Sequence, residues 1–131
     1  MKSVKELVAE TNSKITTLQA ADAIQLLKNW ETDVAFIDLR DTAELQREGK
    51  IPGAVHANRG MLEFYVDPAS PFHNPMFSGG KKLVFYCAGG GRSALATSTA
   101  QMMGVEKVSH IGGGFKAWKE AGGPVVPADK E

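Results

Sequence analysis

The chain has 131 residues, with 15 lysines and arginines balanced by 15 aspartates and glutamates, and it has one cysteine. The length predicts a single domain, residues 1–131, and the balanced charge excludes an overall field that would attract nucleic acid or an anionic membrane. No apolar run approaches the about 18 residues of a membrane span, and one cysteine excludes an internal disulfide. With an N-terminus that lacks a signal peptide's apolar run, these features predict a soluble, cytoplasmic protein.

Short apolar runs alternate with helical patterns along the chain. Apolar residues at helical spacing predict a helix over 20–27, and the run at 34–40 predicts a buried strand. A short helix that ends at Gly49 follows, and a second strand begins at Val55 after the turn at 52–53. This alternation is typical of an α/β domain with a mainly parallel sheet.

The segment 59–80 is the least regular part of the chain, with three prolines and several aromatic residues. A long connection in a small domain is functional or poorly packed, so this segment is a candidate cover for a site. The helix predicted after it is expected to have an inward face of Leu95, Thr99 and Met102, with Ala96, Ala100 and Met103 beside it. The further predicted elements are a strand at 82–86, that helix at 92–103, a strand at 107–111, a helix at 115–122 and a tail at 124–131 that frays.

The single cysteine lies in the stretch "CAGGGRS", between the strand at 82–86 and the helix at 92–103. Cys87 directly follows the strand, at the carboxyl end of the sheet, where open α/β sheets bind ligands. The three glycines can turn their N–H groups toward one point, and the helix start adds unpaired N–H groups and a positive dipole end. Such a cradle stabilises a thiolate or an anionic substrate group, so we interpret Cys87 as a nucleophile rather than a small buried apolar residue.

Two arginines and a serine extend this candidate site. Arg92 has the fork geometry that suits an oxyanion, although a salt bridge to a carboxylate is the alternative. Ser93 offers a hydroxyl, and Arg59 would attract an anionic substrate unless it is simply solvated. The predicted catalytic residue is Cys87, and the predicted substrate-binding residues are Ala88, Gly89, Gly90, Gly91, Arg92, Ser93 and Arg59.

Four segments together resemble the single-domain rhodanese-like sulfurtransferases. "CAGGGRS" resembles that family's C-x-x-G-x-R loop, "FIDLRDTAEL" and "GKIPGAVHA" its two upstream signatures, and "HIGGGFKAWKEAGGPV" its C-terminal end. The resemblance covers about residues 15–125. It implies a rhodanese-like α/β fold, with a five-stranded, mainly parallel sheet flanked by helices on both faces.

The resemblance also implies a reaction. Cys87 would carry a sulfane sulfur as a persulfide, taken from thiosulfate or a similar donor and passed to cyanide, a thiol or an acceptor protein. Six residues run from Cys87 to Arg92, whereas the family's phosphatase and arsenate-reductase relatives have seven, so the loop length favours sulfur transfer. A sulfur-carrier or protein-binding module with little turnover is the alternative.

Asp38 and Arg40 match the family's D-x-R pattern and are expected to be mainly structural near the site. We expect Arg40 to pair with Glu44 and the Asp38 carboxylate to be hydrogen-bonded near the loop, with a catalytic part for Asp38 as the alternative. His56 and His110 are expected to be hydrogen-bonded core histidines. Three scattered histidines and one cysteine predict no metal site, and no cofactor is expected.

Overall fold

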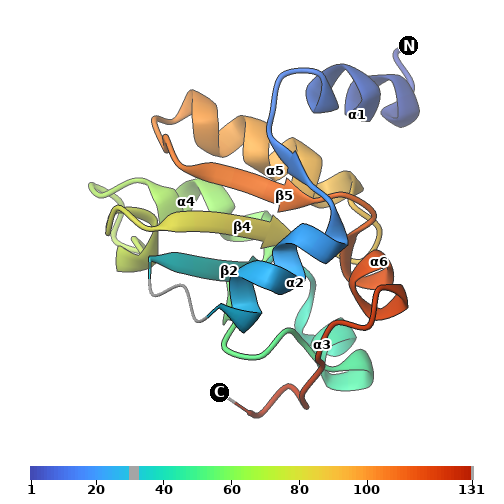
Figure 1. Cartoon of the computed structure of the whole chain (residues 1–131). Helices are drawn as coiled ribbons and strands as arrows, with labels where there is room; N and C mark the ends of the chain where they lie inside the picture. The colour runs from blue at the N-terminus through green and yellow to red at the C-terminus, as the bar shows by residue number, and fades with distance from the viewer. Residues whose placement is uncertain (30–32, 131) are drawn as a thin grey trace.

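A five-stranded parallel sheet forms the centre of the computed structural model, which describes residues 1–29 and 33–130 (Figure 1). Its strand order is β1-β5-β4-β2-β3, and each described pair of neighbours runs parallel. The α/β fold is therefore confirmed, and the sheet is parallel throughout rather than mainly so. The strands are β1 (Thr17–Leu18), β2 (Val34–Asp38), β3 (Val55–His56), β4 (Lys82–Tyr86) and β5 (Val108–Ile111).

Helices cover both faces of the sheet (Figure 1). Helices α4 and α5 contribute to the hydrophobic cluster on one face, and α2 and α6 contribute to the cluster on the other. The helices are α1 (Val4–Asn12), α2 (Ala20–Lys28), α3 (Thr42–Glu48), α4 (Leu62–Val66), α5 (Gly91–Met102) and α6 (Gly114–Glu120), with 3₁₀ turns η1 (Arg59–Met61) and η2 (Pro75–Phe77).

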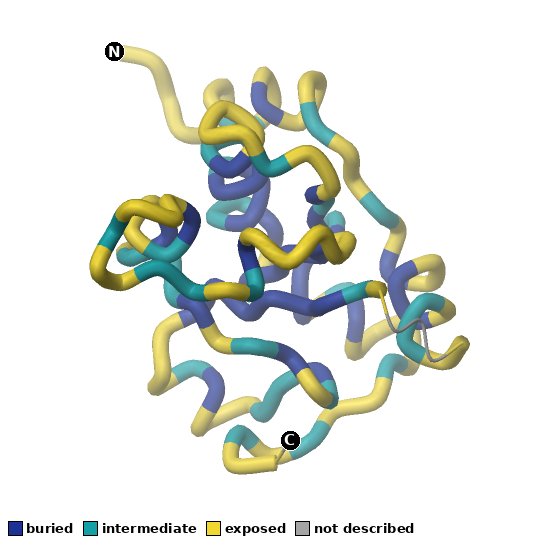
Figure 2. The backbone as a smooth tube through the Cα atoms, turned by 90° about the vertical axis from the view of Figure 1, so that its left-hand side faces the viewer, coloured by how far each residue is buried: buried dark blue, intermediate teal, exposed yellow. Residues whose placement is uncertain are grey.

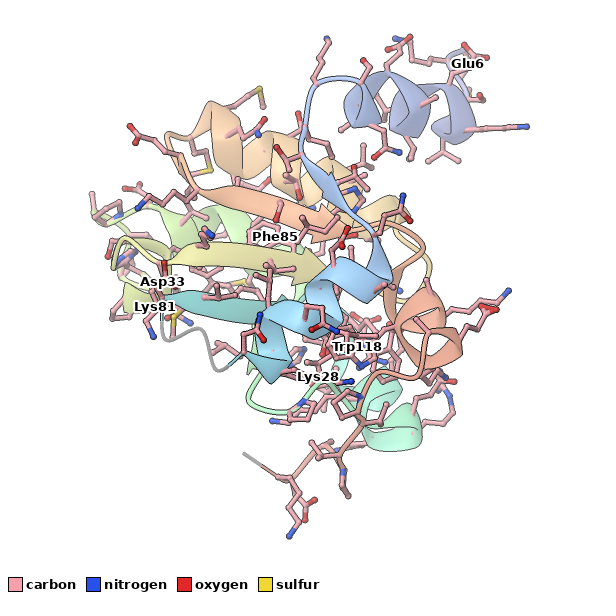
Figure 3. All side chains as sticks on the ribbon, in the orientation of Figure 1. Glu6, Lys28, Asp33, Lys81, Phe85 and Trp118 are labelled. Carbon is pink, nitrogen blue, oxygen red and sulfur yellow. The ribbon has the colours of Figure 1, made fainter. Side chains whose placement is uncertain are left out.

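The central strand β4 is buried on both faces because its side chains alternate between the two clusters. Leu83 and Phe85 pack with α5, whereas Val84 and Tyr86 pack with α2 and α6. Buried residues accordingly run through the middle of the molecule in Figure 2, and exposed ones line its outside. Phe85 and Trp118, both labelled in Figure 3, are fully buried members of the two clusters.

Helix α5 faces the sheet with small residues rather than with the larger ones expected at the centre of its inward face. Its buried residues include Ala96 and Ala100, while the side chain of Met102 is exposed and Leu95 is half-buried. The predicted inward face was therefore wrong for Leu95, Thr99 and Met102, and Met103 is exposed, whereas Ala96 and Ala100, which were expected beside that face, are fully buried. Small side chains let the helix lie close to the strands, which the spacing of large apolar residues does not reveal.

The two ends of the chain are more ordered than the sequence pattern indicates. Helix α1, for which we made no prediction, begins at Ser3, whose hydroxyl accepts a hydrogen bond from the N–H of Glu6 (3.1 Å). Near the other end, Lys50 and Val126 exchange backbone hydrogen bonds of 2.8 and 2.9 Å. The tail was expected to fray, but the structure ties it to the body of the protein at this point.

Candidate active site

The sulfur of Cys87 lies where β4 passes into α5. The residue is 1 % exposed and directly follows the last residue of the strand. The backbone N–H groups of Gly90 and Ser93 both donate hydrogen bonds to Sγ, at 3.2 and 3.3 Å. Two backbone N–H groups, one from a loop glycine and one from the start of α5, are therefore aimed at this sulfur.

The three glycines of the loop differ in what they contribute. Gly90 has a φ of +104°, and a Cβ there would lie 3.2 Å from the backbone nitrogen of Gly113, so this position requires glycine. A Cβ on Gly89 or Gly91 would meet nothing within 4 Å. Gly90 therefore shapes the cradle, while the other two leave open space beside it.

Helix α6 holds the loop from the other side. The N–H groups of Phe115 and Lys116 donate to the carbonyl oxygens of Cys87 (2.8 Å) and Ala88 (3.1 Å). Gly114 makes this approach possible, because a Cβ there would lie 2.6 Å from the carbonyl oxygen of Cys87. Sequence reasoning missed Gly114 as a site residue, although the "GGG" turn before the last helix was the available signal.

Arg92 is engaged with a carboxylate of α3. Its guanidinium donates two hydrogen bonds to Glu44, at 2.8 and 3.0 Å. The hydrogen bond from Arg92 lowers the pKa of Glu44 to about 2, and Glu44 in turn raises the pKa of Arg92. The salt bridge that we considered as the alternative for Arg92 is thus present, and the expected pairing of Arg40 with Glu44 was wrong.

Arg40 pairs instead with Asp38, and both side chains are fully buried. Arg40 donates from Nε to Oδ1 (3.0 Å) and from Nη2 to Oδ2 (2.8 Å), while the hydroxyl of Tyr86 donates to Oδ2 (2.6 Å). Burial opposes the charge of Arg40, but the hydrogen bonds that Arg40 donates to Asp38 and the negative charge of that carboxylate outweigh it, and the pKa of Arg40 is raised. The guanidinium also stacks 4.3 Å from the ring of Phe115. This buried network lies beneath the loop, since Tyr86 directly precedes Cys87.

Arg59 lies on a different part of the α5 surface from the Cys87 loop. Its guanidinium donates to Glu63 (3.1 Å) and to the hydroxyl of Thr99 (3.5 Å). Thr99 is nearly two helical turns beyond Ser93. The described hydrogen bonds of the Arg59 side chain therefore go to α4 and α5, and none joins it to residues 87–93.

Ser93 and His110 are buried next to the thiol. The hydroxyl of Ser93 lies 3.5 Å from Sγ of Cys87 and 2.9 Å from Nδ1 of His110, and burial lowers the pKa of this histidine. The prediction of a hydrogen-bonded core histidine is confirmed for His110. His56 is exposed instead, because β3 is an edge strand, although its ring is bonded to the carbonyl oxygen of Arg40.

Within residues 1–29 and 33–130, no group of three histidine, cysteine, aspartate or glutamate residues is arranged to hold a metal ion. The described helices also include none with the length and apolar character needed to cross a membrane.

The fold, the loop around Cys87 and the comparison of this chain with known proteins together define the class of this protein. The model of the rhodanese-like domain matches residues 19–121, and the chain belongs to the rhodanese-like family. A sulfurtransferase from Allochromatium vinosum is 31% identical over 94 residues, which cover 72% of this chain and 79% of that protein.

Two further relatives have more specific names. Mouse thiosulfate sulfurtransferase/rhodanese-like domain-containing protein 3 is 33% identical over 91 residues, which are 66% of this chain and 58% of that protein, so the match spans little more than half of its length. The structure of a Rhodopseudomonas palustris protein of unknown function, named a possible tyrosine phosphatase, is 54% identical with a TM-score of 0.93 over 96% of both chains.

Proposed function

We propose that this protein is a thiosulfate sulfurtransferase that moves a sulfane sulfur from thiosulfate or a similar donor through a persulfide on Cys87. The observation that carries the proposal is the pair of N–H groups, from Gly90 and Ser93, that donate to Sγ. The rhodanese-like family and the sulfurtransferase relatives support sulfur transfer in general. The sulfur donor and the acceptor belong to the proposal.

The reaction has two displacement steps. The Cys87 thiolate attacks the outer sulfur of thiosulfate, the S–S bond of thiosulfate breaks, and sulfite leaves with the bonding electron pair. A second nucleophile then attacks the outer sulfur of the persulfide, and Cys87 leaves as a thiolate. The chain has no second cysteine, so an external acceptor such as cyanide, a thiol or a partner protein must take the sulfur. A free thiol nucleophile persists in a reducing compartment, so we propose the cytoplasm as the location.

The loop residues provide the proposed site for the anionic sulfur donor. Gly89 and Gly91 leave open space beside the cradle, and Ala88 is half-buried next to them. Arg92 keeps its positive charge while it is bonded to Glu44, and its side chain is 40% exposed, so it can contact an anion and Glu44 together. The guanidinium of Arg59 is engaged with Glu63 and Thr99, which weighs against a direct contact with the donor. Arg59 would then attract the anionic donor only through its positive charge.

A phosphatase is the function suggested by the name of the Rhodopseudomonas palustris relative. Phosphatase relatives of this family have a seven-residue loop, whereas this chain has six residues from Cys87 to Arg92. The shorter loop supports a persulfide sulfur over a tetrahedral phosphate. The alternative function is a sulfur carrier that accepts sulfur from a protein. Such a carrier would also hold the sulfur as a persulfide on Cys87.

The test is the intact mass of the protein before and after thiosulfate, and again after cyanide, with Cys87→Ser as the control. We expect a gain of one sulfur atom that cyanide removes as thiocyanate and that the variant never shows. A thiol that still alkylates but gains no sulfur would contradict the thiosulfate reaction. Sulfur gained only from a persulfidated protein would favour the carrier, and release of phosphate from an aryl phosphate would favour the phosphatase.

A further inference from the structure

A line of polar contacts connects the buried thiol of Cys87 with the protein surface. It passes from Sγ to Oγ of Ser93 (3.5 Å) and from there to Nδ1 of His110 (2.9 Å). The other ring nitrogen, Nε2, lies 3.1 Å from the hydroxyl of Thr17 and 3.2 Å from Oδ1 of Asn12. Ser93 and His110 are buried, whereas Thr17 and Asn12 are exposed.

The surroundings of His110 keep its ring neutral. Its described hydrogen-bond partners are uncharged and come from α1, β1 and α5, and Phe85 is its neighbour on β4. Burial without a compensating charge lowers the pKa of His110. The ring therefore has one N–H group, which sits on either Nδ1 or Nε2.

In each of the two neutral tautomers, both ring nitrogens of His110 have a hydrogen-bond partner. With the proton on Nε2, the ring donates to Oδ1 of Asn12, and Nδ1 accepts a hydrogen bond from the hydroxyl of Ser93. With the proton on Nδ1, the ring donates to Oγ of Ser93, and Nε2 accepts from the hydroxyl of Thr17. The two arrangements differ in the direction of the Ser93 hydroxyl.

The direction of that hydroxyl matters for the charge on sulfur. When Ser93 donates to His110, its oxygen is free to accept the S–H of Cys87, which suits a thiol. When His110 donates to Ser93, the hydroxyl proton has two acceptors, the carbonyl oxygen of Gly90 (3.3 Å) and Sγ, and a negative charge on the sulfur draws it to Sγ, which suits a thiolate. The thiolate is the attacking group in the first step of the proposed reaction and the leaving group in the second.

We propose that the tautomer of His110 follows the protonation state of Cys87, so that the histidine aims the Ser93 hydroxyl at the sulfur whenever the sulfur is anionic. On ionisation, the S–H proton moves to Oγ, the former hydroxyl proton moves to Nδ1, and Nε2 passes its proton to the hydroxyl of exposed Thr17, whose own proton goes to the solvent. One proton leaves the protein, and the ring is neutral before and after. His110 acts through Ser93 and is a positioning residue.

This inference rests on the proposed function because it concerns the same thiolate, but it is tested without a sulfur donor. Nitrogen-15 NMR of the imidazole rings distinguishes the two neutral tautomers and the imidazolium. We expect His110 to have its proton on Nε2 below the pH at which Cys87 ionises and on Nδ1 above it. In Cys87→Ser, the ring should keep one tautomer across the same pH range. A wild-type ring that keeps one form, or that becomes an imidazolium as the thiol ionises, overturns the inference.

Thr17 provides a second measurement with a matched control. Thr17→Val keeps the shape of the side chain but removes the hydroxyl that supports the Nδ1–H tautomer, whereas Thr17→Ser keeps it. Since Cys87 is the only cysteine, ultraviolet absorbance of the thiolate follows it alone. We expect the pH midpoint of the thiolate absorbance to rise by about half a pH unit in Thr17→Val and to stay unchanged in Thr17→Ser. On the acid side of the midpoint, this rise means roughly threefold less thiolate. Equal midpoints in both variants overturn the inference. If the NMR and absorbance results are as expected but thiosulfate adds no sulfur to Cys87, the proposed function fails, while the coupling between the His110 tautomer and the Cys87 charge stands.

Discussion

Arg92 and Glu44 are joined by two parallel hydrogen bonds, although one residue lies in the first turn of α5 and the other in the first turn of α3. This pair ties the cationic side of the Cys87 loop to the helix that follows β2. The position of the charge next to the sulfur thus depends on a residue far away in sequence.

Glu44→Gln should lower the free energy of unfolding by about 1 kcal/mol or less at neutral pH, because the pair is partly exposed to solvent. The pKa of Glu44 is lowered from 4.5 to about 2, so the carboxylate stabilises the folded state above pH 4.5 and loses this effect as the pH falls toward 2. Urea unfolding at several pH values should therefore show the wild-type advantage shrinking in this window. Glu48→Gln on the same helix, at an exposed position, is the control. An advantage that does not change with pH would contradict the assignment.

Arg92→Ala separates a structural from a substrate-binding role of the arginine. It removes the same ion pair as Glu44→Gln and should cost similar stability. If Arg92 also orients the anionic donor, its loss should raise KM for thiosulfate by about tenfold, the effect of one charged hydrogen bond, while Glu44→Gln leaves KM nearly unchanged. Equal KM values in the two variants would mean that Arg92 serves the ion pair alone.

Gly114→Ala should damage both stability and sulfur transfer, because the new Cβ would press on the carbonyl oxygen of Cys87 and φ is +62°. We expect a loss of about 2 to 4 kcal/mol in unfolding free energy. Gly122→Ala is the matched control, since φ there is +84° but a Cβ would meet nothing within 4 Å. It should cost about 1 kcal/mol and leave the transfer rate unchanged. Equal losses in both variants would mean that the loop tolerates the added methyl group.

Tyr86→Phe tests the buried network beneath the loop. The hydroxyl donates to Asp38 (2.6 Å) and accepts from the N–H of Ile51 (3.2 Å), so its removal leaves both partners with an unmet hydrogen bond. Chemical denaturation should show a loss of about 1 to 3 kcal/mol. Tyr65→Phe should change stability little, because the Tyr65 hydroxyl has no hydrogen-bond partner among the described residues. A tolerant Tyr86→Phe would argue that Arg40 alone satisfies Asp38.

The sequence predicted those parts of the site that are local in the chain. Cys87, Gly90 and Ser93 lie within seven residues, and the strand, the glycines and the helix start are enough to bring them together. The partners of the arginines were harder to assign. Arg40 was expected to pair with Glu44, but it pairs with Asp38, two residues away, and Glu44 pairs with Arg92, which is distant in sequence.

The contacts of His110 had no sequence signal that specified them. An isolated histidine in an apolar strand predicts burial and a hydrogen bond, and both are present. Its partners Ser93, Thr17 and Asn12 come from α5, β1 and α1, and two of these three elements were not predicted as such. Only the packing of α1 and α5 around the β1 edge of the sheet brings these side chains to one ring.

The pair of backbone hydrogen bonds between Lys50 and Val126 affects the order in which parts of the protein can form during synthesis. Gly49, next to Lys50, provides the carbonyl oxygen that accepts a hydrogen bond from buried Arg40 (2.7 Å). The C-terminal segment also holds Trp118, whose indole N–H donates to the carbonyl oxygen of Pro124 (2.8 Å). Pro124 and Val126 follow the thiol loop in the chain, so they leave a ribosome after it. A nascent chain therefore exposes the sulfur of Cys87 before these supporting contacts have formed.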